Sequence, residues 1–401
     1  MKLALKPTAI GEVVDRSKSW NPSRSSVDEV FQYIDLSAVD QDAKVITGAR
    51  EVSCCEAPSR ARQLVESGDI LVSTVRPNLN GVARVPEQLD GATASTGFCV
   101  LRANKTKASG AYLFHWVKSS AFISDMVSKA TGASYPAVSD RIIFESQIPL
   151  PPLAEQKRIA AILDAADALR TKRRETLAQL DALLQSTFLT LFGDPVENPM
   201  RWPKSTIDEL VDNIDSGWSP TCLDRPANDM EWGVLKLGAV TYCIYRDDLT
   251  KALPSGLTPR PEIEVQKGDL LFARKNTYDL VAACAYVHET RPKLMLPDLI
   301  FRLRLSKAAK TEPIFMWQQL VVPRLRKHIQ SFAGGAAGSM PNISKAKLRA
   351  IEVICPPLPL QQKFAAIVES VERQKAAQCA HLAELDALFA ALQHRAFRGE
   401  L

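Results

Sequence analysis

One motif occurs twice in this chain, half a chain apart. The stretch PPLAEQKRIAAIL begins at Pro151, and PPLPLQQKFAAIV begins at Pro356. Other matches keep the same order in both halves: KPTAIGEVV with PKSTIDELV, YIDLSAVD with VLKLGAVT, GDILVSTVRPN with GDLLFARKNTY, YLFHW with PIFMW, and GASYPAVSD with GSMPNISKA. Six matches in register predict a tandem duplication, which has to be recognised before a fold is assigned.

Each copy has a longer part and a shorter part. The longer part mixes short β-type runs, DILVSTV and FCVLRA in the first copy and DLLFARK and IFRLRL in the second, with helical stretches and turn residues. This mixture predicts an α+β domain of about 150 residues. We therefore divide the chain into two globular domains, 1–148 and 197–353, each followed by a helical segment, 149–196 and 354–401.

The shorter parts begin at paired prolines, Pro151-Pro152 and Pro356-Pro357. Proline lacks the amide donor and restricts the residue before it, so these pairs end a domain and precede a helix. Ala, Leu, Glu, Gln, Lys and Arg dominate the following residues, and all of them favour helix. A run of about 38 helical residues would extend for about 57 Å.

Apolar residues in both helical segments recur at alternating steps of three and four. This heptad spacing is typical of a seam between two helices. The two segments align without a gap, and we expect them to pair antiparallel as a coiled-coil-like spacer, giving a pseudo-two-fold arrangement. A helix that packs only on its own domain is the alternative. The expected helix-pair or partner interface consists of Leu177, Leu180, Leu184, Leu191, Leu382, Leu385, Phe389 and Leu392.

Charge is distributed unevenly along the 401 residues, which carry 50 Lys and Arg against 45 Asp and Glu. The basic surplus falls in the two longer parts, with 17 basic against 16 acidic residues in 1–147 and 22 against 18 in 197–353. This favours contact with nucleic acid through local patches on two domains. Ordinary surface variation is an equally good explanation of the counts alone.

Two domains of different sequence, each followed by a PPL…Q…AAI helix that ends near LF, closely resemble the specificity subunit of type I restriction–modification systems. The resemblance implies that residues 1–148 and 197–353 are target recognition domains, each of which reads one half of a split DNA sequence. It implies that the helical pair spaces these domains and binds two methyltransferase (modification) subunits. Because the two domains differ outside the shared anchors, the half-sites should differ as well.

The same resemblance assigns all catalysis to other chains. It implies that this subunit is non-catalytic and holds no cofactor, and that S-adenosylmethionine binds the methyltransferase partners, which methylate adenine. In systems that also cleave DNA, restriction or translocase subunits would use ATP and Mg²⁺. Two alternatives stay open: a related system with a fused methyltransferase–nuclease partner, and a helical-hairpin scaffold that binds without reading sequence.

Two matched loops in each domain are the candidate DNA-binding segments. Arg, Lys, Asn and Gln read base edges, and Ser, Thr and Lys often bind phosphate. The alternative is that these polar residues only form turns. The candidates are Arg76, Asn78, Asn80, Ser134, Tyr135 and Ser139 in the first copy, and Arg274, Lys275, Asn276, Thr277, Ser339, Asn342, Ser344 and Lys345 in the second.

Motifs for catalysis are missing from the sequence. There is no G-x-G-x-x-G or G-x-x-x-x-G-K-[ST] stretch, and no Asn-Pro-Pro-aromatic motif. The five histidines lack metal-ligand spacing, and no apolar run approaches the ~20 residues that cross a bilayer. The sequence thus predicts a cytoplasmic protein with no catalytic residues, no metal site and no membrane span.

Overall fold

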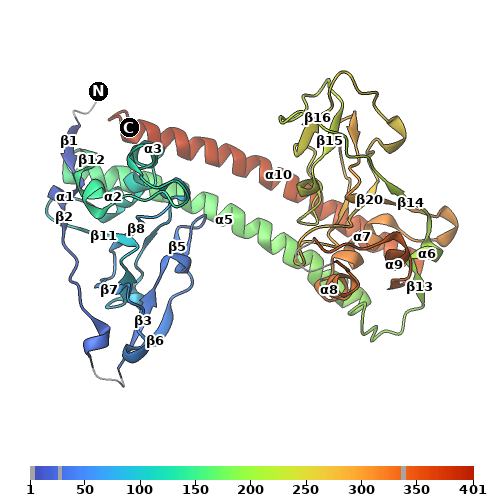
Figure 1. Ribbon diagram of the computed structural model, residues 1–401, viewed down its shortest axis with the longest axis horizontal. Coiled ribbons are helices and arrows are strands. Elements are labelled where there is room, and N and C mark those ends of the chain that lie inside the picture. Colours follow the sequence, from blue (N-terminus) through green and yellow to red (C-terminus); the bar gives the residue numbers. More distant parts are fainter. Residues whose placement is uncertain (1–4, 26–28, 336–339) are drawn as a thin grey trace. The chain divides into compact units, whose positions relative to one another are not determined.

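A computed structural model describes residues 5–25, 29–335 and 340–401 of the chain. The chain forms two compact units, Met1–Glu175 with Ala380–Leu401 (unit 1) and Thr176–Cys379 (unit 2). Each unit contains one α+β domain, a stretch of the long helix α5 (Leu153–Phe192) and a stretch of the long helix α10 (Leu358–Ala396) (Figure 1).

The domain of unit 1 is built on two four-stranded sheets. One is antiparallel with the order β2-β11-β8-β9, and the other has the order β6-β3-β10-β7, with β10 parallel to β3. The pairs β1-β12 and β4-β5 form two separate two-stranded sheets. The elements are β1 (Lys6–Ala9), α1 (Ile10–Val13), β2 (Val14–Asp15), β3 (Val30–Ile34), β4 (Val39–Asp40), β5 (Val45–Ile46), β6 (Arg50–Ser53), β7 (Ala61–Leu64), β8 (Ile70–Ser73), β9 (Val82–Arg84), β10 (Thr93–Ser95), β11 (Phe98–Ala103), α2 (Gly110–Val117), α3 (Ser120–Lys129), α4 (Asp140–Glu145) and β12 (Gln147–Leu150).

The domain of unit 2 repeats this plan. Its larger sheet has the order β14-β20-β17-β18, its smaller sheet the order β16-β15-β19 with β19 parallel to β15, and β13 pairs with β21. The elements are β13 (Lys204–Thr206), α6 (Ile207–Leu210), β14 (Val211–Ser216), β15 (Gly233–Leu235), β16 (Thr250–Ala252), β17 (Leu270–Ala273), β18 (Cys284–Tyr286), β19 (Leu294–Met295), β20 (Ile300–Leu305), α7 (Pro313–Val321), α8 (Pro323–Ser331), α9 (Lys345–Arg349) and β21 (Glu352–Ile354).

The repeated Gly-Asp pairs have the same structural role in both domains. Gly68 and Gly268 take positive φ angles of 88° and 92° in the turn before β8 and β17. The aspartate that follows the first of them, Asp69, accepts a hydrogen bond from Arg102 Nη2 at 2.7 Å. Asp269 accepts the equivalent bond from Arg302 Nη1 at 3.1 Å. The Gly-Asp pair that both copies share therefore forms a turn that is bonded to the neighbouring strand.

The glutamine of the PPL…Q motif has the same structural role in both copies. Gln156 is buried in the first turn of α5, where its Nε2 donates to Pro151 O at 2.9 Å and its Oε1 accepts from Ser109 N at 2.8 Å. Gln361 makes the same two bonds, to Pro356 O at 2.6 Å and from Glu312 N at 3.0 Å. Each glutamine thus attaches the start of a long helix to the start of α2 or α7.

Replacement of Gln156 by alanine should destabilise unit 1. The substitution removes hydrogen bonds from a site that is almost fully buried, and we expect a loss of about 2 kcal/mol in the free energy of unfolding. Gln147→Ala is the matched control, because its side chain is exposed, and it should change stability by less than about 0.5 kcal/mol. Urea unfolding of the full chain measures both; equal effects would show that the motif glutamine does not hold the helix.

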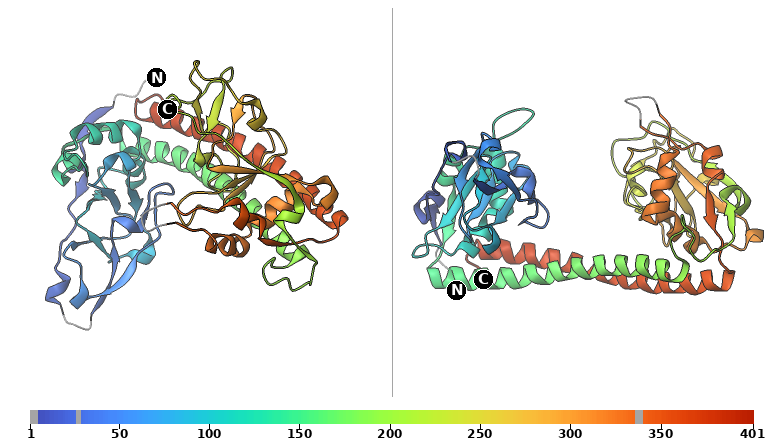
Figure 2. Two further views of the ribbon diagram at one scale, coloured as in Figure 1. Left: turned by 45° about the vertical axis from the view of Figure 1, so that its right-hand side comes forward. Right: turned by 90° about the horizontal axis from the view of Figure 1, so that it is seen from below.

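The long helices run antiparallel within each unit, as predicted (Figure 2). In unit 1, Arg170 of α5 pairs with Asp386 of α10 at 2.6 Å. In unit 2, Asp181 of α5 pairs with Lys375 of α10 at 2.7 Å. The helices contain 40 and 39 residues, and each begins directly after its proline pair. Pro359 lies in the first turn of α10, where the missing amide costs no helical hydrogen bond.

Each helix packs on both domains, which the heptad pattern did not reveal. The start of α5, through Ile159 and Leu163, shares a core with the first domain, and its end, through Phe188 and Phe192, shares a core with the second. Of the predicted seam residues, Leu184 and Phe389 are buried, and the other six are half-buried, namely Leu177, Leu180, Leu191, Leu382, Leu385 and Leu392.

Candidate nucleic-acid interface

The two candidate loops of the first domain lie together, although 60 residues separate them in the sequence. Val75, just after β8, forms an isolated antiparallel bridge with Ala137. Arg76 N donates to Pro136 O at 2.7 Å. The loop after β8 and the loop before α4 therefore form one surface, and both were singled out separately from sequence.

Arg76 and Tyr135 are exposed on this surface and contact each other. The Arg76 guanidinium lies over the Tyr135 ring, 4.7 Å from its centroid, and 68% of the Tyr135 side chain is exposed. Arg76 has a φ of 51°, in the left-handed region that non-glycine residues seldom adopt. Such strained residues occur preferentially at functional sites. The stacked ring limits the conformational freedom of the guanidinium, so less entropy would be lost if it bound a base or a phosphate.

The second domain joins its loops in the same way. Lys275 forms an antiparallel bridge with Asn342, and Ile343 N donates to Arg274 O at 2.8 Å. The Arg274 guanidinium lies 5.2 Å from the centroid of Phe301. Among the described residues, Arg274 Nε and Asn342 Oδ1 are buried polar atoms without a hydrogen-bond partner. Buried polar atoms normally bond to protein or to ordered water, and both of these atoms belong to residues at the junction of the two loops.

Several candidate side chains are engaged within the fold. Asn80, in the left-handed region, donates from Nδ2 to Val117 O at 2.9 Å. Asn276 is buried and donates to Thr241 Oγ1 at 3.3 Å. Ser139 and Ser344 cap α4 and α9. Lys345 Nζ donates to Ile214 O at 2.5 Å. For these five residues the structure gives a role that requires no ligand.

The remaining candidates are more accessible. Asn78, Ser134 and Thr277 are exposed, and Lys275 is half-buried. Ser339 lies outside the described residues. Sequence reasoning also passed over Tyr278, which follows Thr277 and is 64% exposed. The signal for it was present, because Tyr278 aligns with Asn78 in the GDILVSTVRPN and GDLLFARKNTY stretches.

Lys44 is hydrogen-bonded to the end of the loop that follows β8. Lys44 Nζ donates to Asn80 O at 2.6 Å. Burial of the Lys44 ammonium, followed by the nearby charge of Lys118, lowers its pKa.

Within residues 5–25, 29–335 and 340–401, no group of three or more His, Cys, Asp or Glu is placed to hold a metal ion. Over the same residues, no helix combines the length and apolarity of a membrane span.

Comparison with known proteins gives consistent matches. A family model described as the type I restriction modification DNA specificity domain matches residues 62–180. The chain is 35% identical over 179 residues to the type I restriction enzyme EcoEI specificity subunit of Escherichia coli, a match that covers 44% of this chain and only 30% of that protein. It is 25% identical over 366 residues to the EcoKI specificity subunit of Escherichia coli strain K12, covering 84% of this chain and 76% of that protein.

A solved structure is similar over the full length. It is described as the structural basis of complex assembly and conformational transition of the type I R-M system. The two chains are 26% identical and superpose with a TM-score of 0.56, and the similarity covers 100% of each. The fold of the whole chain therefore has a counterpart in a solved structure.

Proposed function

The chain belongs to the specificity subunits of type I restriction–modification systems, and we propose that it recognises one asymmetric, bipartite DNA sequence for such a system. The observation that carries this proposal is the loop pair that each domain joins in the same way. Val75 pairs with Ala137 in the first, and Lys275 with Asn342 in the second. We assign residues 1–148 and 197–353 to the two target recognition domains.

The side chains on the two loop surfaces differ, which supports two different half-sites. The first surface presents Arg76 stacked on Tyr135, and the second presents Arg274 over Phe301 beside Asn342. Arginine forms paired hydrogen bonds with guanine, and asparagine does so with adenine. The helical segments 149–196 and 354–401 would set the length of the unread gap between the half-sites.

Catalysis and cofactor binding would belong to partner chains. We propose two methyltransferase subunits, carrying S-adenosylmethionine for adenine methylation, and in a restricting system ATP-dependent cleavage subunits. Exposed leucines on the long helices support a partner there: Leu169 is 56%, Leu183 48% and Leu388 50% exposed. The printed description of the solved relative concerns complex assembly.

Arg274→Ala tests the second loop surface. If the guanidinium reads a base, its loss should weaken binding of the cognate duplex by about 1–3 kcal/mol and relax one position of one half-site. The partner-bound complex is tested at fixed salt on duplexes that vary single positions. These measurements give the loss of affinity and the change in base preference at each position. Lys267→Ala, which removes an exposed charge elsewhere in the domain, is the control. A uniform loss for every sequence would instead identify Arg274 as a phosphate contact.

The proposed function predicts a methylation pattern in the cell. Single-molecule sequencing of host DNA, with and without this gene, should reveal methylated adenines in one bipartite motif that disappears when the gene is deleted. Two different half-sites with an unread gap would support the proposal. An unchanged methylation pattern in a host whose partner genes are expressed would contradict it.

A further inference from the structure

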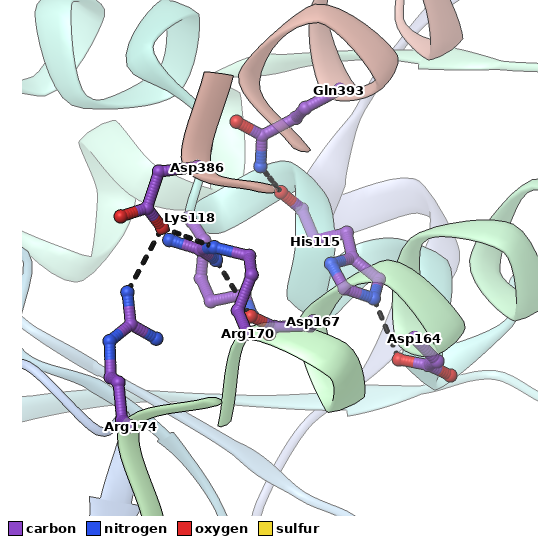
Figure 3. Close-up of polar contacts among 8 residues, drawn as sticks. All are labelled: His115, Lys118, Asp164, Asp167, Arg170, Arg174, Asp386 and Gln393. Carbon is purple, nitrogen blue, oxygen red and sulfur yellow. Dashed lines mark hydrogen bonds and ion pairs between the residues drawn. The ribbon is translucent and has the colours of Figure 1, made fainter. Parts of the chain in front are cut away.

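A chain of ion pairs connects the first domain to both long helices (Figure 3). Lys118, which follows α2, pairs with Asp167 of α5 at 2.8 Å. The other oxygen of Asp167 accepts from Arg170 Nη1 at 2.7 Å. Arg170 Nε reaches Asp386 of α10 at 2.6 Å, and Arg174 Nη2 reaches the same carboxylate at 3.0 Å. One connected cluster therefore spans three elements of unit 1.

The domain end of this cluster is buried. The Lys118 side chain is only 9% exposed, and its ammonium lies 4.4 Å from the ring centroid of Phe114 and 5.9 Å from that of Phe389. Burial lowers the pKa of the Lys118 ammonium despite its carboxylate partner. Burial alone would raise the pKa of the Asp167 carboxyl, but the hydrogen bond from Lys118 and the charges of Lys118 and Arg170 lower it. The Lys118 end of the pair is therefore largely desolvated, whereas Asp167 keeps 29% of its side chain exposed.

A second set of contacts joins the same surfaces. His115 Nε2 lies 2.7 Å from Asp164 Oδ1 of α5, and Gln393 of α10 donates to His115 O at 3.1 Å (Figure 3). The His115 ring is fully buried, and burial lowers its pKa. The last turn of α2 is therefore held by directional bonds from both long helices as well as by apolar packing.

The residue before Lys118, Val117, is hydrogen-bonded to the candidate DNA-binding loop, residues 74–80. Val117 O accepts the Asn80 side-chain amide at 2.9 Å, and Asn80 O accepts Lys44 Nζ at 2.6 Å. Asn80 ends the short 3₁₀ turn Pro77–Leu79 that follows Arg76. The loop and the ion-pair cluster thus meet at two consecutive residues, Val117 and Lys118.

Unit 2 has no charge at the equivalent domain positions. When the YLFHW and PIFMW stretches are aligned, Gln319 corresponds to Lys118 and Met316 corresponds to His115. Gln319 is fully buried, and its Nε2 contacts Met316 Sδ at 3.6 Å. A helix-to-helix pair is nevertheless present, because Lys375 of α10 contacts Asp181 of α5 at 2.7 Å. The second partner of Lys375, Glu372 at 2.8 Å, lies in α10 itself. The charge of Lys118 is therefore dispensable for pairing the helices.

A buried ion pair contributes little net stability compared with apolar packing, and its best attested use is to select one arrangement among several. We propose that Lys118 is a positioning residue that fixes the reading loop, residues 74–80, in one place on the α5–α10 helix pair. It would thereby restrict the gap length at which the first half-site is accepted. This inference rests on the proposed reading of a bipartite site.

Lys118→Gln introduces the residue that unit 2 has at this position, and it leaves Asp167 paired with Arg170. The partner-bound complex is tested on duplexes that carry the methylation-mapped half-sites at the native gap and at gaps one base pair shorter or longer. We expect the preference for the native gap to fall at least about fivefold, the low end of coupling between sites. Discrimination against single-base changes within each half-site should persist. Lys118→Arg, which keeps the cation, should recover most of the gap preference.

Lys129→Gln is the matched control, because Lys129 forms an exposed pair with Asp125 within α3 of the same domain. It should leave the gap preference unchanged. If the Lys118→Gln complex is not recovered, Asn80→Gly cuts the connection at the loop end, and glycine tolerates the left-handed backbone there. Unchanged gap preference, or an equal loss of affinity for all duplexes, would overturn the inference. Absence of any bipartite preference in the unmodified complex would overturn the proposed function instead.

Discussion

Insertion of one heptad into both long helices is expected to lengthen the gap in the recognised sequence. Seven helical residues add about 10 Å, which corresponds to about three base pairs. Because three base pairs are about a third of a duplex turn, the second half-site also rotates, and we expect the new optimum among gaps about two to four base pairs longer. The native gap should lose most of its specific binding, on the order of 10³-fold.

The insertion points follow from the ion pairs of the two helices. Insertions after Glu175 and after Cys379 lie between the Arg174–Asp386 pair and the Asp181–Lys375 pair, so both pairs can form again. Insertion into only one helix is the control, because it puts the pairs out of register and should abolish specific binding at every gap. Binding selection over duplexes of graded gap length gives the result. An unchanged preferred gap would show that the helices do not set the spacing.

Asp167→Asn should destabilise the first domain much more than Lys118→Gln does. The asparagine leaves the Lys118 ammonium buried without a carboxylate, and loss of one partner from a buried pair costs about 3 kcal/mol or more. Lys118→Gln leaves Asp167 bonded to Arg170, so we expect a cost of about 1 kcal/mol. The double variant Asp167→Asn, Lys118→Gln should lose about as much stability as Lys118→Gln alone, since no unpaired cation remains.

Hydrogen exchange of the α2 amides in the full chain measures this local stability. Asp125→Asn is the control, because its partner Lys129 is 46% exposed, and surface pairs contribute less than about 1 kcal/mol. Equal destabilisation by Asp167→Asn and Lys118→Gln would mean that the pair acts only through packing. That result would also remove the physical basis for Lys118 as a positioning residue.

The duplication made the fold largely predictable. FCVLRA and IFRLRL form strands with the predicted bounds, Phe98–Ala103 and Ile300–Leu305, because a short, mainly apolar run is a local signal of a buried strand. The proline pairs marked the helix starts for the same reason. The predicted seam includes Leu191, whereas its neighbours Phe188 and Phe192 are the fully buried residues. A helix that packs on domains as well as on another helix buries a wider face than a two-helix seam does.

The candidate interface was predictable only in part. Both loops were marked by polar residues after a glycine, but their pairing is a long-range contact that no local pattern specifies. Residue type also does not show where a side chain points. Asn78 is exposed while Asn80, two positions later, bonds Val117 O. No sequence pattern identifies Lys118, because its burial depends on α5 and α10, which come together only in the folded chain.

Selection of bound duplexes from a random library by the partner-bound complex tests the central claim most directly. The account predicts enrichment of two different half-sites at one fixed gap, with a preference of about 10³ or more over unrelated sequences at constant salt. Enrichment of a single contiguous motif, or retention of all duplexes alike, would contradict it.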